Sequence, residues 1–276
     1  MRYEATAAEA ELGFAGLAIL RTWPPTNRAR YVREVAAQLA GERWRETLVV
    51  EEHDVERGYR LWADSYDTLA NPLIDLEAPI VRSMIDRSPL GAALDAACGT
   101  GRHAAYLAAN GRYVIAVDVS PAMLARARER LPDADLRIGQ LESLPVDDAQ
   151  VDLAVCALAL THCECLSSPI IELARVVRPG GSVILSDIHP ISAATGGHAF
   201  FREPDGHLSM MRNHVHWHEE YVAAFRAAGL TILECREPKV DEEAADQLAP
   251  SPATRHWTRV ALIGLPFALI WHLEKR

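Results

Sequence analysis

The sequence has no apolar run long enough to cross a membrane. Its longest run, ALIGLPFALIW (261–271), is interrupted by Pro266, whereas a membrane-spanning helix needs about 20 apolar residues. The first residues, MRYEATAAEAELGF, also lack the basic-then-apolar order of a secretory signal peptide. We therefore expect a cytoplasmic protein that makes no membrane contact.

An excess of positive charge is missing as well. The chain has 38 acidic residues against 28 lysines and arginines, which gives a net charge of -10. A protein that binds nucleic acid needs a basic face for the phosphates. We therefore expect no nucleic-acid partner.

Cysteine is scarce and shows no metal-binding spacing. The five cysteines, an odd number, are scattered along the chain, which favours reduced thiols over disulfides. Cys163 and Cys165 follow His162 closely, but no second Cys/His pair stands at zinc-finger spacing. We predict no metal site from this segment.

From residue 92 onward, short apolar runs alternate with helical segments. Helices are expected at 103–109, 121–131, 170–177 and 219–228, and strands at 92–97, 113–118, 136–139, 151–159, 182–188, 230–235 and about 267–272. Such alternation is typical of an α/β fold, in which a doubly wound, mostly parallel sheet carries helices on both faces.

Two segments do not follow this alternation. Residues 1–57 are predicted to form a helical N-terminal extension or cap, and three roles are open to it: a lid, a packing cap or the arm of a homodimer. Residues 58–276 form the main domain. Within it, residues 189–217 are rich in His, Gly and Pro, which predicts an irregular, lid-like insertion.

A glycine turn follows the first expected strand of the main domain. Gly99 and Gly101 stand where a doubly wound sheet binds its ligand, and Asp118 ends the next strand, where a carboxylate can accept from ribose hydroxyls. A dinucleotide site uses G-x-G-x-x-G, but Ala104 takes the third glycine's place. Asp95, just before the turn, would repel a pyrophosphate and suits a cofactor with an ammonium group. An NAD(P)-dependent oxidoreductase is the less favoured alternative.

These motifs together resemble those of class I S-adenosylmethionine (SAM)-dependent methyltransferases, in the small-molecule methyltransferase type 11 group. The resemblance rests on LDAACGTGRHAAYLA, AVDVSPAML, IGQLESLPVDDAQVDLAVCALALTH and ELARVVRPGGSVILSDIHP, and it covers roughly residues 59–275. It implies a Rossmann-like seven-stranded sheet with an antiparallel last strand, SAM as cofactor and S-adenosylhomocysteine (SAH) as product.

The resemblance also implies roles for the residues around SAM. The methionine end would face Asp95 and the backbone around Ala97 and Gly99, and Gly101 would let the turn approach the cofactor closely. Asp118 would bind the ribose, Ala157 would lie beneath the sulfonium, and the adenine would be bound by Val119, Met123, Gln140 and Leu141. Gln140 departs from the acid that the family often has there, although its carbonyl can accept the same hydrogen bond. Tyr66 resembles the tyrosine that closes over the methionine end; a core aromatic is the equal alternative.

The fourth strand is followed by ALALTH, without the Asp/Asn-Pro-Pro-aromatic sequence of enzymes that methylate base amines or glutamine amides. We therefore expect a small-molecule acceptor methylated at O, N or C. His162 and His189 each follow a strand end, and both are candidates for a general base or for a structural imidazole. Whether the other histidines up to His218 bind a metal is left open. So is SAM binding that serves cyclisation or rearrangement without methyl transfer.

Overall fold

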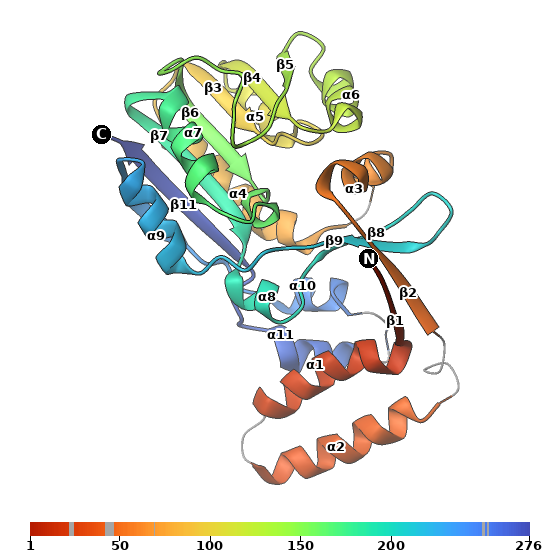
Figure 1. Cartoon of the computed structure of the whole chain (residues 1–276). Coiled ribbons are helices and arrows are strands. Elements are labelled where there is room, and N and C mark those ends of the chain that lie inside the picture. Colours follow the sequence, from red (N-terminus) through yellow and green to blue (C-terminus); the bar gives the residue numbers. More distant parts are fainter. Residues whose placement is uncertain (22–24, 42–46, 69, 250–251, 253) are drawn as a thin grey trace.

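A seven-stranded sheet forms the centre of the molecule (Figure 1). The structure, a computed structural model, describes residues 1–21, 25–41, 47–68, 70–249, 252 and 254–276. Across the sheet the strands are β10 (Leu230–Arg236), β11 (Ala268–Lys275), β7 (Val177–Ile188), β6 (Val151–Ala157), β3 (Ala92–Ala96), β4 (Tyr113–Asp118) and β5 (Asp135–Ile138).

Strand direction in this sheet matches the expected topology. β11 runs antiparallel to both β7 and β10, and the pairs from β7 to β5 are parallel. The chain order reverses between β3 and β6, which lie side by side, so the two loops leaving them separate at the carboxyl edge. Such a reversal is where doubly wound sheets bind ligands. The predicted fold class is confirmed.

Helices cover both faces of this sheet. They are α4 (Pro72–Arg87), α5 (Arg102–Ala109), α6 (Pro121–Arg130), α7 (Ser167–Val176) and α9 (His218–Ala227). The apolar faces of α7 and α9 pack on one side with Leu173 and Phe225 fully buried, while α4 and α5 pack on the other with Met84 and Leu107. Burial of such side chains stabilises the fold by roughly 1.5–3 kcal/mol each.

A second, four-stranded sheet combines the two segments that break the alternation. Its order is β1 (Arg2–Thr6), β2 (Thr47–His53), β9 (Leu208–Met211) and β8 (Ala199–Arg202). β2 and β9 are parallel neighbours although about 160 positions separate them. The extension predicted to be helical contains α1 (Ala7–Arg21) and α2 (Pro25–Leu39) but also β1 and β2, and the insertion predicted to be irregular contains β8 and β9. Each segment contributes one antiparallel pair, β1–β2 and β8–β9, and the parallel pair β2–β9 joins them into one sheet. The register of that central pair depends on how the rest of the chain packs, so neither segment indicates it by itself.

Most of the remaining helices lie at the same end of the molecule as the second sheet (Figure 1). They are α1 (Ala7–Arg21), α2 (Pro25–Leu39), α3 (Val55–Trp62), α8 (Pro190–Ala194), α10 (Glu242–Gln247) and α11 (Arg255–Leu262), with a short 3-10 helix, η2, at Leu160–His162. Ala18 of α1 and Ala261 of α11 are fully buried in a shared apolar cluster. Among the helices that the structure describes, none is long and apolar enough to span a bilayer.

Candidate active site

The turn after β3 forms one wall of a cavity at the carboxyl edge of the sheet. Gly101 adopts a φ of 80°, and a Cβ there would lie 3.3 Å from the Cβ of Ala127, so the position favours glycine. Asp95 is buried, and its Oδ2 accepts a 2.7 Å hydrogen bond from the backbone N–H of Ala104 in the first turn of α5. Burial raises the pKa of Asp95 to about 6. The predicted acid therefore lies at the cavity and also caps a helix.

Asp118, at the end of β4, forms the adjacent wall. Its carboxylate accepts 2.8 Å hydrogen bonds from the backbone N–H groups of Gly99 and Ser120. Burial raises the pKa of Asp118 although these bonds favour its charged form. Each carboxylate oxygen retains a second acceptor site, so the group can hold the turn and still accept hydrogen bonds from a ligand.

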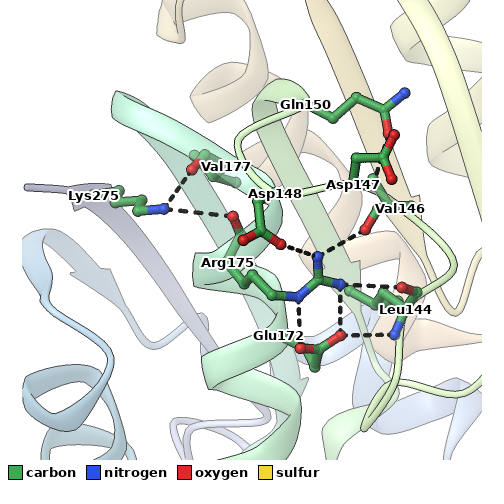
Figure 2. A network of polar contacts seen from close by, with 9 residues as sticks. All are labelled: Leu144, Val146, Asp147, Asp148, Gln150, Glu172, Arg175, Val177 and Lys275. Carbon is green, nitrogen blue, oxygen red and sulfur yellow. Dashed lines mark hydrogen bonds and ion pairs between the residues drawn. The ribbon is translucent and has the colours of Figure 1, made fainter.

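The loop between β5 and β6 supplies a third wall through Gly139, Gln140 and Leu141. Arg175 of α7 holds the far part of this loop, as Figure 2 shows. Its guanidinium donates to the carbonyls of Val146 (2.8 Å) and Leu144 (3.1 Å) and to the carboxylates of Asp148 and Glu172, both at 2.7 Å. The loop that carries the expected adenine-binding residues is thereby tied to the helical layer.

The fourth wall joins β6 to α3. Ala157 ends β6, and the next residue, Leu158, has a φ of 57°, a backbone conformation that a non-glycine residue adopts at a cost and that is common at functional sites. η2 then places His162 opposite Tyr59 of α3, with 2.9 Å between the His162 Nε2 and the Tyr59 Oη. Burial lowers the pKa of His162 to about 4, so the imidazole is neutral at pH 7.

A buried charged network lies beside the turn. Glu77 of α4 is fully buried, and its carboxylate contacts Arg102 (2.8 Å), His103 (3.1 Å) and the hydroxyl of Ser186, which donates at 2.7 Å. Burial opposes the charge of Glu77, but these three partners outweigh it and lower its pKa to about 2. Arg102 and His103 also line the cavity.

The cavity has a volume of about 390 Å³, within the usual range of roughly 300–1,000 Å³ for small-molecule sites. Most residues predicted to bind the cofactor line it, namely Tyr66, Asp95, Ala97, Gly99, Asp118, Val119, Met123, Gln140, Leu141 and Ala157, together with His162. Gly101 is not among the described lining residues; it lies one residue behind the wall, where α5 begins.

His189 does not join this group. It is buried as the N-cap of α8, where its Nδ1 accepts from the backbone N–H of Ile191 at 3.2 Å. Its Nε2 lies 3.2 Å from Glu237, which also contacts His218 at 2.7 Å. The geometry thus does not support the catalytic role predicted for His189. A strand end fixes where the chain emerges but not the direction of the next side chain.

These three side chains also have their potential ligand atoms within 4.8 Å of one another. The neutral His189 accepts through Nδ1, so its proton is on Nε2 and points to Glu237. If a metal bound Nε2, this proton would have to move to Nδ1, where it would face the backbone N–H of Ile191, which is itself a donor. The contacts are those of a hydrogen-bonded cluster that joins the two ends of the insertion.

Four residues of the site were missed by the sequence analysis: Tyr59, Glu77, Arg102 and His103. Arg102 and His103 directly follow the glycine turn, and a helix N-terminus at a ligand edge is a signal that could have identified them. Tyr59 and Glu77 lie on helices before the sheet, where helical periodicity alone does not distinguish a wall residue from a core residue.

Comparison with known proteins agrees with this geometry. Residues 94–185 match the methyltransferase domain family. A malonyl-(acyl-carrier protein) O-methyltransferase from Yersinia pestis is 32% identical over 142 residues, which are 51% of this chain and 52% of that protein. The chain thus matches about half the length of this curated relative.

Solved structures share the fold over a larger part of the chain. A SAM-dependent methyltransferase from Mesorhizobium loti has a TM-score of 0.53 at 22% identity and covers 70% of this chain and 96% of its own. The cyclase SpnF has a TM-score of 0.57 at 19% identity and covers 82% and 98%. The fold is that of the SAM-dependent methyltransferases.

Proposed function

We propose that this chain, whose residues 94–185 match the methyltransferase domain family, transfers the methyl group of SAM to a small-molecule acceptor. The observation that carries the proposal is the placement of Asp95 and Asp118 on adjoining walls of one cavity at the carboxyl edge of the sheet. Asp118 suits a ribose, and Asp95 suits a positively charged group rather than a pyrophosphate.

The residues present fit this cofactor at its methionine end. His103 is buried, lines the cavity, and leaves its Nδ1 without a hydrogen-bond partner among the described residues. Its Nε2 faces the Glu77 carboxylate, so Nδ1 is the ring atom left for a ligand. A buried ring nitrogen without a partner suits a polar group at the methionine end, and Arg102 beside it suits the methionine carboxylate.

When bound, SAM supplies a methyl group activated by a sulfonium. The chain's own contribution is to hold and orient. Asp118 and the turn at Gly99 would fix the nucleoside, Arg102 the amino-acid end, and Ala157 the floor below the reacting centre. Alignment of this kind is worth effective molarities of ~10⁵ M or more. We place the reaction in the cytoplasm, since all five cysteines are free thiols.

Calorimetric titration with SAH, SAM and NADH tests the proposal. We expect saturable binding of SAH and SAM and no heat from NADH. Tight binding of NADH without binding of SAH would overturn the assignment. A second assay, transfer of labelled methyl from SAM into an extract of small metabolites, then identifies the acceptor by its mass.

A second candidate function uses the same SAM-binding residues but transfers no methyl group; the enzyme would instead catalyse a cyclisation or a rearrangement. We consider it because the cyclase SpnF has a similar fold. The two candidates differ in stoichiometry: methyl transfer forms one SAH for each product molecule, whereas the rearrangement forms product with no SAH. Measuring both species in one reaction separates them.

A further inference from the structure

Tyr59 and His162 form a pair in the cavity wall that joins two distant segments. Tyr59 lies on α3 and His162 on η2, 103 positions apart, and the Tyr59 Oη lies 2.9 Å from the His162 Nε2. Both residues line the cavity together with Asp118 and Ala157. The pair therefore faces the same space as the groups assigned to the cofactor.

The other side of the imidazole fixes the direction of this hydrogen bond. His162 Nδ1 lies 3.2 Å from the backbone carbonyl of Arg212, directly after β9. A carbonyl cannot donate, so Nδ1 carries the proton and Nε2 is an acceptor. Tyr59 must then donate its O–H to Nε2. Its phenol oxygen retains lone pairs that can accept a hydrogen bond from a molecule in the cavity.

The charges of the cavity select against an anionic acceptor. Three carboxylates, those of Asp95, Asp118 and Glu142, stand among the described lining residues. Arg102 is the one arginine or lysine among them, and it is paired with the fully buried Glu77. Apart from the sulfonium of SAM itself, a carboxylate acceptor would gain no cation to replace its hydration beside these acids, which is unfavourable.

We propose that the acceptor is a neutral hydroxyl compound, and that Tyr59 is a catalytic residue which takes the hydroxyl proton while passing its own to His162. This inference rests on the proposed methyl transfer and names its substrate class. The acceptor oxygen bonds to the methyl carbon as the carbon–sulfur bond breaks, and the sulfur keeps the electron pair. One positive charge thus leaves the sulfonium and ends on the His162 imidazolium.

A proton relay is needed for a hydroxyl and has no task for a carboxylate. A hydroxyl oxygen becomes positively charged as it is methylated, so removal of its proton stabilises the transition state, typically by ~10²–10⁴-fold in rate. An ionised carboxylate has no proton to lose. Burial keeps His162 unprotonated at pH 7, and even a weak base can take the proton of a methylated, positively charged hydroxyl oxygen.

Nitrogen-15 NMR of the histidine side chains tests the pair without any acceptor. With SAH bound, we expect His162 to show the Nδ1–H form and to stay unprotonated down to about pH 5. Tyr59→Phe should move the Nε2 resonance toward that of an imidazole without a donor. An Nε2–H form of His162, or a His162 that is already protonated at pH 7, would overturn the relay.

Matched acceptors test the substrate class, with labelled SAM as donor. The panel pairs alcohols and phenols with carboxylic acids that have the same carbon skeleton. It also includes malonyl-(acyl-carrier protein), the substrate in the name of the Yersinia pestis relative. We expect methylation of hydroxyl members at least about tenfold faster than of their acid partners. Equal or faster transfer to the acids, or no transfer to any hydroxyl member while SAH binds normally, contradicts the class. Failure to bind SAH would instead contradict the proposed function itself.

Two variants then test the residues. Tyr59→Phe and His162→Gln should each lower kcat by ~10²–10⁴-fold and leave the Kd of SAH within about twofold. Glutamine keeps an acceptor for the Tyr59 hydroxyl but cannot be protonated, so it separates the relay from the hydrogen bond. Tyr106→Phe is the matched control, because the Tyr106 hydroxyl binds Asp86 at the surface. An unchanged kcat in Tyr59→Phe would remove Tyr59 from the mechanism.

Discussion

The backbone N–H of Gly99 donates a 2.8 Å hydrogen bond to the carboxylate of Asp118. These residues belong to two motifs that follow different strands, β3 and β4, which pair in parallel. The acid expected to bind ribose therefore also fixes the turn that approaches the methionine end. Removing the charge of Asp118 and removing its hydrogen bonds should therefore affect cofactor affinity and protein stability to different extents.

Asp118→Asn keeps one carbonyl oxygen and removes the charge, whereas Asp118→Ala removes the hydrogen bonds to both Gly99 and Ser120. We expect Ala to weaken SAH binding at least about tenfold and also to lower stability by ~1–3 kcal/mol, because a buried N–H group and a partly buried one lose their acceptor. Asn should weaken binding with a smaller loss of stability. Calorimetry and urea unfolding measure the two effects. An SAH affinity unchanged in the Ala variant would refute the ribose assignment.

Arg102→Gln should distinguish the two ends of the cofactor. We expect it to weaken SAH binding at least about tenfold, because a charge-assisted contact to the amino-acid carboxylate is lost. Binding of 5′-methylthioadenosine, which lacks that amino-acid part, should change by less than about twofold. Arg226→Gln, on the exposed side of α9, is the control. Equal losses for both ligands would mean that Arg102 only supports Glu77.

Asp187→Asn should stabilise the protein increasingly as the pH rises. Asp187 is buried, and burial raises its pKa from 3.8 to about 7 although Tyr221 donates to it at 2.8 Å. Between pH 3.8 and about pH 7, the Asp187 carboxyl group is therefore more protonated in the folded state than in the unfolded state. Wild-type stability is therefore lost as the pH rises through this window, by at most on the order of 4 kcal/mol.

Urea unfolding of both proteins from about pH 4 to about pH 7.5 measures this difference. The gain of Asp187→Asn over wild type should grow across the window and level off above it. A difference that does not vary with pH would show that the Asp187 carboxyl titrates normally. Tyr221→Phe adds a check, because loss of the donor should raise the pKa of Asp187 further and extend the loss of stability to higher pH.

His189→Ala should lower stability and leave turnover nearly unchanged. The side chain caps α8 and contacts Glu237, and loss of an N-cap costs typically about 1 kcal/mol. Since His189 is not among the described residues that line the cavity, we expect kcat and SAH affinity close to wild type. A large fall in kcat at unchanged stability would restore the catalytic role that the sequence indicated.

The sequence alone predicted the main sheet because its signals are local. β3, β4 and β6 are short apolar runs, and turn or capping residues such as Ser120 before α6 mark where helices begin or end. Asp95, Gly99 and Asp118 occupy fixed places relative to those strand ends. Their arrangement at one edge follows from parallel pairing, which the alternation of elements already requires.

The tertiary structure alone decided which residues form the cavity wall opposite the carboxyl edge of the sheet. Nothing in residues 47–53 indicates that they pair with residues 208–211, because register between distant strands depends on how the rest of the chain packs. That pairing places Arg212 where its carbonyl fixes the His162 tautomer, and α3 places Tyr59 against Nε2. The residues assigned to the cofactor thus lie on neighbouring elements of the chain, while the Tyr59–His162 pair depends on contacts between segments 50 to 103 positions apart.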